Sequence, residues 1–220
     1  MAKAGVSKEQ ETYDRLKEEI LTGVLAPGTL ISETEMTQRY EVSQSPVRHA
    51  IARAQEAGLL RSIPRRGYAV TFLNLADIKE ILFLRSIVEP EAAALACVNL
   101  TAEELAELEE LSKLTYKAGD PSSYFHFMVA NKKFHLIIAR ASRNRRLEAW
   151  NSQLLDDLQR AVLHVIAIGD PADNVAEHGR IVAALASRDP AIARNAALKG
   201  VQVALQRIST YLGSMPNGAG

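Results

Sequence analysis

The chain has 220 residues, of which 47% are hydrophobic, and 26 Lys and Arg balance 26 Asp and Glu. This length suits two modest domains, and zero net charge excludes a protein that is basic throughout. No apolar run approaches the roughly 18 residues that a membrane span requires. Because the N-terminus lacks an apolar signal and Cys97 is the single cysteine, we expect a cytoplasmic protein without disulfides or a membrane partner.

The first 72 residues mix short helical patterns with one strand-like stretch. Apolar residues at helical spacing predict a helix that ends at Gly23, before a turn at Pro27-Gly28. Ser32 and Glu35 have the spacing of a capping box, which predicts a short second helix ending near Glu41.

A third helix is predicted from Gln44 to Ala57, with Ser43 as its N-cap and Gly58 after its end. At 100° per residue, apolar side chains share one stripe, namely Val47, Ala50, Ile51 and Ala54. The other side carries Gln44, Ser45, Arg48 and His49. One face of this helix can therefore pack while the other contacts a partner.

Two apolar stretches joined by Pro64 to Gly67 then predict a hairpin with a basic tip. Three short helices followed by such a hairpin describe a winged helix-turn-helix, whose third helix enters the major groove of DNA by its N-terminal end. The residues expected to contact DNA are Arg39, Ser43, Gln44, Ser45, Arg48, Arg65, Arg66 and Gly67. The alternative is a solvated basic helix and a charged hairpin tip.

These residues resemble the DNA-binding domain of the GntR family of bacterial transcription regulators. The resemblance covers residues 13–70 and rests on I20, G23, L25, P27-G28, L30, S32-E33, V42-S43, P46-V47-R48, A50, G58-L59 and G67. Gln44 stands where the family commonly has Arg, so we expect a different base preference there. Glu41 stands where the family often has Gly, so we expect mild strain in the turn between the helices.

After a linker at 73–76, residues 77–212 predict an all-helical bundle of six to seven helices, and 213–220 predict a disordered tail. The start signals are Thr101 with Glu104, Asp120-Pro121, Asp170-Pro171 and Asp189-Pro190. The expected helices are 77–98, 102–118, 122–141, 145–168, 173–187 and 190–212. The fold class is therefore mainly α, a winged helix-turn-helix domain (1–72) plus a helical bundle.

This second half is similar to the FCD domain of the FadR subgroup of the GntR family. The similarity rests on R85 with E89, F134-H135, S142-R-N144, L147, E177-H178, I181 and D189-P190. It implies a cavity for a small carboxylate or sugar acid, and in many members a divalent metal held by an Asp and three His. The implied effector-binding residues here are Arg85, Asn131, His135 and His178.

The metal is an open question, because Asn131 stands where the family has Asp and Gly200 stands near the position of its last His. His135, His178 and Asn131 would make a weak site for Zn, Ni or Mn. The competing interpretation drops the metal and lets these side chains and Arg85 bind an anion. In a third, Arg85 only bridges Glu89 and the histidines are core residues. His126 points away from His135, and His164 contributes only if its helix faces the cavity.

We therefore expect a homodimeric regulator, most simply a repressor, that binds double-stranded operator DNA and responds to a small carboxylate effector. Two alternatives belong to other classes: a small metal-dependent enzyme using His135 and His178, and an architectural DNA binder without an effector. The sequence has no Ser-His-Asp order, HExxH or glycine-rich phosphate loop, which argues against an enzyme.

Overall fold

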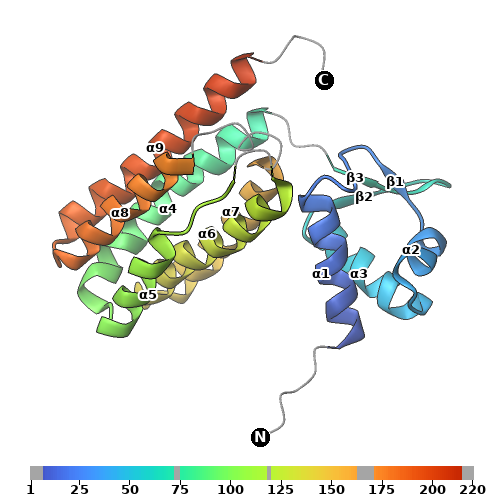
Figure 1. Ribbon diagram of the computed structural model, residues 1–220, viewed down its shortest axis with the longest axis horizontal. Coiled ribbons are helices and arrows are strands. Elements are labelled where there is room, and N and C mark those ends of the chain that lie inside the picture. The colour runs from blue at the N-terminus through green and yellow to red at the C-terminus, as the bar shows by residue number, and fades with distance from the viewer. Residues whose placement is uncertain (1–6, 72–74, 118–119, 163–170, 215–220) are drawn as a thin grey trace, which may run out of the picture. The chain divides into compact units, whose positions relative to one another are not determined.

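The computed structural model describes residues 7–71, 75–117, 120–162 and 171–214. The chain divides into two compact units, residues 1–73 and 74–220, and Figure 1 shows that helices dominate both. The mainly α fold class is thereby confirmed. In the described part of the chain, no helix is both long enough and apolar enough to cross a bilayer.

The N-terminal unit contains three helices and a small sheet in the described residues: α1 (Lys8–Leu21), β1 (Leu30–Ile31), α2 (Glu33–Tyr40), α3 (Gln44–Glu56), β2 (Leu60–Ile63) and β3 (Gly67–Val70). The strand order is β1-β3-β2 and all pairs are antiparallel. The hairpin of β2 and β3 is the predicted wing. The sequence analysis missed β1, because two residues are too few to show an alternating pattern.

Caps and apolar stripes place these elements. The Ser32 hydroxyl accepts from the Glu35 N–H at 3.1 Å, the expected start of α2. Ser43 takes the N-cap position of α3, although its side chain makes no capping hydrogen bond. The apolar stripe of α3 is buried as predicted and packs on α1, α2 and β2. The predicted winged helix-turn-helix is therefore present.

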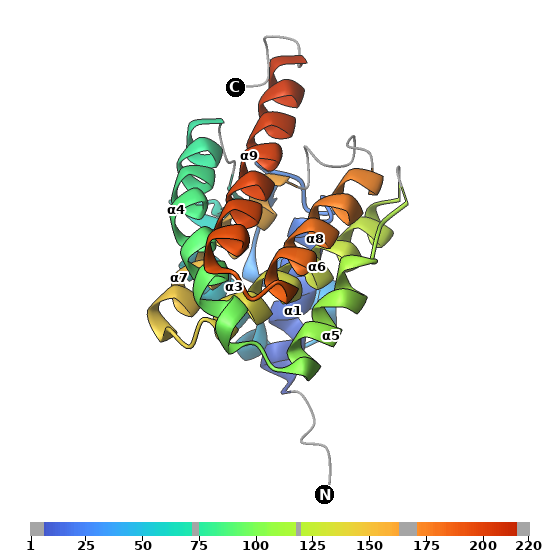
Figure 2. The same ribbon diagram turned by 90° about the vertical axis from the view of Figure 1, so that its left-hand side faces the viewer.

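The C-terminal unit contains six helices in its described residues: α4 (Leu75–Asn99), α5 (Ala102–Ser112), α6 (Pro121–Ala141), α7 (Arg145–Val162), α8 (Pro171–Ala186) and α9 (Pro190–Ser214). Figure 2 shows α9 between α4 and α8. Thr101 and Glu104 form the complete capping box that was expected. The Asp120 and Asp189 carboxylates cap α6 and α9 by accepting backbone N–H groups. The cap expected at Asp170 lies outside the described residues.

Several helix boundaries differ from the prediction, most by one or two residues. Helix α5 ends at Ser112, not at 118, because Tyr116 leaves the helical path and packs its ring 5.0 Å from Tyr124 and 5.1 Å from Phe127. Helix α4 begins at Leu75, within the expected linker. Helix α9 includes 213 and 214 of the expected tail, whose remaining residues lie outside the described range, as does the predicted extension of α7 to 168.

The core of the C-terminal unit lies between α4, α5, α6, α8 and α9. Its buried side chains include Leu108, Phe134, Ile181 and Leu185. Helix α4 also packs against α7. A cavity lies beside this core, and the residues around it carry the chemistry considered next.

Candidate functional site

The first candidate site is the opening turn of α3. Gln44, Ser45 and Arg48 are exposed there, while Val47 and Ala50 on the opposite face are buried. Ser43 is exposed as well. An amide, hydroxyls and a guanidinium can all hydrogen-bond base edges or phosphates. The predicted separation of a packing face from a polar face is present.

Arg48 is held in place by a neighbour that the sequence analysis did not single out. Its Nε donates to Glu33 Oε2 at 2.7 Å, and the Tyr68 hydroxyl donates to the other oxygen of Glu33 at 3.4 Å. The Arg48 side chain nevertheless stays 61% exposed. The carboxylate at the start of α2, itself bonded to the wing, thus holds Arg48 while most of its side chain stays exposed.

Arg39 is tied to the body of the unit. Its Nε donates to Glu19 Oε2 at 2.9 Å, and the Tyr40 hydroxyl donates to the same oxygen at 3.2 Å. Burial and the Glu19 charge raise the pKa of Tyr40 well above its ordinary value. This cluster joins α1 to α2, so Arg39 has a structural partner besides any phosphate that it contacts.

Arg65 and Arg66 lie exposed at the tip of the wing. The Arg66 N–H donates to the Ile63 carbonyl at 3.0 Å, and Arg65 adopts a positive φ of 62°. Gly67 has φ of 95°, and a Cβ there would lie 2.5 Å from the Ile31 carbonyl oxygen. The close approach of β1 to β3 therefore explains Gly67 without DNA.

Glu41, between α2 and α3, adopts a left-handed conformation with φ 55° and ψ 39°. The expected strain at this position is confirmed, since a residue other than glycine is disfavoured there.

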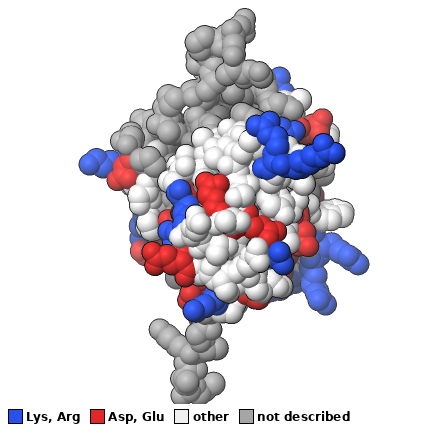
Figure 3. Space-filling view, turned by 90° about the vertical axis from the view of Figure 1, so that its right-hand side faces the viewer, with Lys and Arg blue, Asp and Glu red and all other residues white. Residues whose placement is uncertain are grey.

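The surface charge of the N-terminal unit is mixed. Figure 3, which views this unit from the right-hand side of Figure 1, shows acidic side chains interspersed with Lys and Arg. The face is not uniformly basic, so any DNA contact must use individual arginines.

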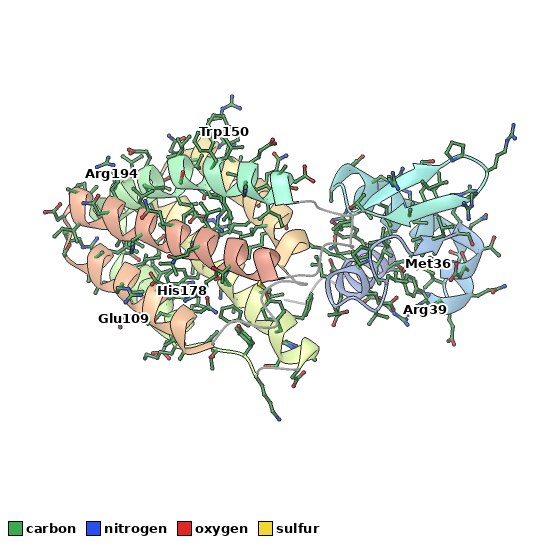
Figure 4. The ribbon with its side chains drawn as sticks, turned by 90° about the horizontal axis from the view of Figure 1, so that it is seen from above. Met36, Arg39, Glu109, Trp150, His178 and Arg194 are labelled. Atoms are coloured by element: carbon green, nitrogen blue, oxygen red, sulfur yellow. The ribbon has the colours of Figure 1, made fainter. Side chains whose placement is uncertain are left out.

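The second candidate site is a cavity of about 80 Å³ in the C-terminal unit. All four residues predicted to bind an effector line it: Arg85 from α4, Asn131 and His135 from α6, and His178 from α8. Figure 4 shows His178 within the helical bundle. The sequence analysis missed Asn174 and Arg207, which line the cavity from α8 and α9 and share a hydrogen bond of 2.9 Å. No periodicity or motif marked either of them.

Arg85 and Glu89 form a buried ion pair at one side of this cavity. Arg85 Nε donates to Glu89 Oε1 at 2.5 Å, and both side chains are at most 8% exposed. Burial raises the pKa of Glu89, but the Arg85 and His135 charges and the Arg85 hydrogen bond outweigh it, so the pKa falls below its usual value. The predicted i,i+4 bridge exists, and Arg85 also lines the cavity.

Burial favours the uncharged form of the two cavity histidines. Burial lowers the pKa of His135 to about 4. Burial, reinforced by His135 and Arg85, lowers that of His178 to about 3. Their rings lie 5.5 Å apart, and Phe134 stacks on His178 at 4.3 Å. His178 Nδ1 is buried without a hydrogen-bond partner in the described structure.

The described residues do not fit a metal ion. No three His, Cys, Asp or Glu side chains among them come together as a metal site. Asn131 offers a neutral amide oxygen, and Gly200 lines the cavity without any donor. His126 is exposed and bonded to the Ser122 carbonyl, while His164 lies outside the described residues.

Comparison with known families covers both units. Residues 8–70 match the bacterial regulatory proteins of the gntR family. Residues 80–202 match the FCD domain. The chain belongs to the GntR family. The resemblance seen in the sequence is thereby confirmed, and the C-terminal unit of this GntR protein is an FCD domain.

Individual relatives agree with this assignment. YdhC of Bacillus subtilis (strain 168), an uncharacterized HTH-type transcriptional regulator, is 34% identical over 62% of this chain and 61% of its own length. A probable D-xylose utilization operon transcriptional repressor of Paenarthrobacter nicotinovorans is 33% identical over 84% of this chain and 82% of its own. The solved structure of E. coli McbR/YncC has a TM-score of 0.77 and 25% identity, covering 94% of this chain and 99% of that one. These relatives and the family are regulators, not enzymes.

Proposed function

We propose that this GntR-family chain is a cytoplasmic transcription repressor that binds operator DNA as a homodimer and responds to a small organic or sugar acid. The observation that carries the DNA-binding half is the first turn of α3, which exposes Gln44, Ser45 and Arg48 while the apolar stripe of the same helix is buried. The wing arginines Arg65 and Arg66 supply contacts to phosphate or the minor groove.

An exposed apolar face supports the homodimer. Phe83 is 64% exposed and Ile87 is 51% exposed on α4, one turn apart. Trp150, 58% exposed on the neighbouring α7, points away from the bundle in Figure 4. A closed pair of copies covers the same patch on both partners. Two winged domains would then read half-sites about 34 Å apart, one helical turn of DNA.

The effector would act through the helical cavity. A ligand that binds one dimer arrangement more tightly than another favours that arrangement and so changes the affinity for the operator. A coupling free energy of about 1 to 3 kcal/mol changes this affinity roughly 5- to 150-fold. The proposed repressor role follows the Paenarthrobacter nicotinovorans relative, a probable D-xylose utilization operon transcriptional repressor.

The test is to select binding sites from random DNA with the full chain and then to titrate the selected site with and without small carboxylates. We expect a palindromic site and an affinity that changes with at least one acid. Binding to all sequences alike would contradict the regulator, and a site whose affinity ignores every acid would favour the architectural binder without an effector.

A further inference from the structure

We infer that the FCD cavity of this chain binds a small carboxylate directly, without a metal ion, because the described residues that line it do not form a set of metal ligands. This inference rests on the proposed effector function. It differs from that function in stating which groups hold the ligand, and Arg85, His135, His178 and Asn131 are the groups assigned.

The donor set is the first argument. Asn131 and His135 lie one turn apart on α6, and His178 faces them from α8. Asn131 contributes an amide in place of a carboxylate, so these three side chains offer a cation no negative charge. The two carboxylates that line the cavity are both paired: Glu89 accepts from Arg85 at 2.5 Å, and Glu177 accepts from Arg180. A divalent cation would therefore find no free carboxylate among the described lining residues that surround the histidines.

Arg85 supplies the second argument. Its guanidinium lines the cavity, and its Nε donates to Glu89 at 2.5 Å. A guanidinium carries five N–H donors in a planar fork, so beyond the Glu89 bond it can donate to the oxygens of a bound carboxylate.

His178 is the third argument. Its residue surface is 6% exposed, and its Nδ1 has no partner in the described structure. Because buried polar atoms are nearly always paired, this atom indicates a ligand or water that completes the site. A neutral imidazole has one donor and one acceptor nitrogen, so it can serve a carboxylate or a hydroxyl of an organic acid.

Gly200 makes the inference testable. A Cβ at this position would meet only the end of the Ile181 side chain, at 3.4 Å, so a longer side chain can be introduced into the cavity wall. Replacing Asn131 by Asp and Gly200 by His would supply the two ligands that the family resemblance places there. Any metal affinity gained by that pair would show that these two positions control metal binding.

The first experiment measures metal content of the full chain by elemental analysis, and its melting temperature with Zn²⁺, Ni²⁺ or Mn²⁺ and with EDTA. We expect no stoichiometric metal and no EDTA effect in the natural chain, but about one Zn²⁺ per chain and an EDTA-sensitive melting temperature in Asn131→Asp/Gly200→His. The control, Gly200→Ala with Asn131 kept, should remain metal-free. A stoichiometric metal in the natural chain, or a double variant that binds none, would overturn the inference.

The second experiment screens lactate, pyruvate, succinate and malate for thermal stabilisation in the presence of EDTA. We expect at least one to raise the melting temperature, and the rise to vanish in Arg85→Gln/Glu89→Gln, which removes both charges of the buried pair together. His126→Ala, on the exposed face of α6, is the control that should keep it. Stabilisation that appears only with added metal, or in none of the four acids, would overturn the inference while leaving operator binding unaffected.

Discussion

At the scale of single residues, both sites are built on an arginine fixed by a glutamate. Arg48 is held by Glu33 in an exposed pair, and Arg85 by Glu89 in a buried one. The exposed pair contributes little to stability, because solvent screens it. Its role is orientation, whereas the buried pair must stay complete because a lone buried charge is strongly destabilising.

Arg48→Ala should weaken binding to the selected operator by about 1 to 3 kcal/mol if the side chain reads a base. The melting temperature should hardly change, since the side chain is exposed. Titration of labelled operator at fixed salt measures the effect. Arg140→Ala is the matched control, an arginine 62% exposed and paired with Glu148 in the helical domain. Equal operator affinities for Arg48→Ala and the natural chain would remove Arg48 from the reading set.

Gln44→Arg should move base preference at one symmetric operator position from adenine toward guanine. Glutamine pairs with adenine N6 and N7, whereas arginine pairs with guanine O6 and N7. Site selection from random DNA with both proteins compares the two preferences. Identical selected sites would show that Gln44 does not face a base.

Stability should fall as pH drops from 7 to 5, through the cavity histidines. The folded pKa values of about 4 and about 3 for His135 and His178 lie below the ordinary 6.5. The unfolded chain therefore takes up protons first, so the stabilisation is complete above about pH 6.5 and is lost as pH falls. Between pH 7 and pH 5, each histidine should lower the free energy of unfolding by about 2 kcal/mol. Urea unfolding at both pH values measures this, and a His135→Gln/His178→Gln chain with the same pH slope would contradict it.

At the scale of elements, tertiary contacts decide where the chain departs from its local pattern. The left-handed Glu41 ends α2 and turns the chain into α3. Tyr116 ends the helical path of α5 because its ring is buried against α6. Strand β1 is only two residues long, and Gly67 is the residue that lets β3 lie against it.

Gly67→Ala should destabilise the N-terminal unit by about 3 kcal/mol. A positive φ alone costs roughly 1 to 3 kcal/mol, and the added methyl group meets the backbone oxygen of Ile31 at 2.5 Å. Gly179→Ala is the control, because a Cβ there meets nothing within 4 Å and alanine favours a helix by about 1 kcal/mol. In chemical unfolding, the free energy of unfolding should fall for Gly67→Ala and rise for Gly179→Ala. A Gly67→Ala variant as stable as the natural chain would contradict the close approach of β1 to β3.

At the scale of the whole molecule, zero net charge means that DNA affinity depends on a few placed arginines. The chain divides into a unit that presents these arginines and a unit that holds a cavity. In the proposed dimer, a ligand in the cavity would bias the separation of the two winged domains.

Phe83→Asp/Ile87→Asp should convert the homodimer to a monomer, because it places charge on the apolar patch of α4. Light scattering after size-exclusion chromatography measures the mass, and operator affinity should fall with it. Val129→Asp is the control, since Val129 is similarly exposed, at 53%, but lies on α6. A double variant that stays dimeric would locate the dimer contact elsewhere. A natural chain that is monomeric at all concentrations tested would exclude the dimer.

Local periodicity, caps and turn residues sufficed to predict the winged helix-turn-helix and the polar opening of α3 from the sequence. Helical spacing placed His135 and Asn131 on one face, since they are four residues apart, and the family resemblance added Arg85 and His178 to them. The tertiary structure was needed to show that these four line one cavity, that Glu33 holds Arg48, and that Arg207 and Asn174 complete the wall. Those contacts link residues far apart in the chain, and no local pattern encodes which helices pack side by side.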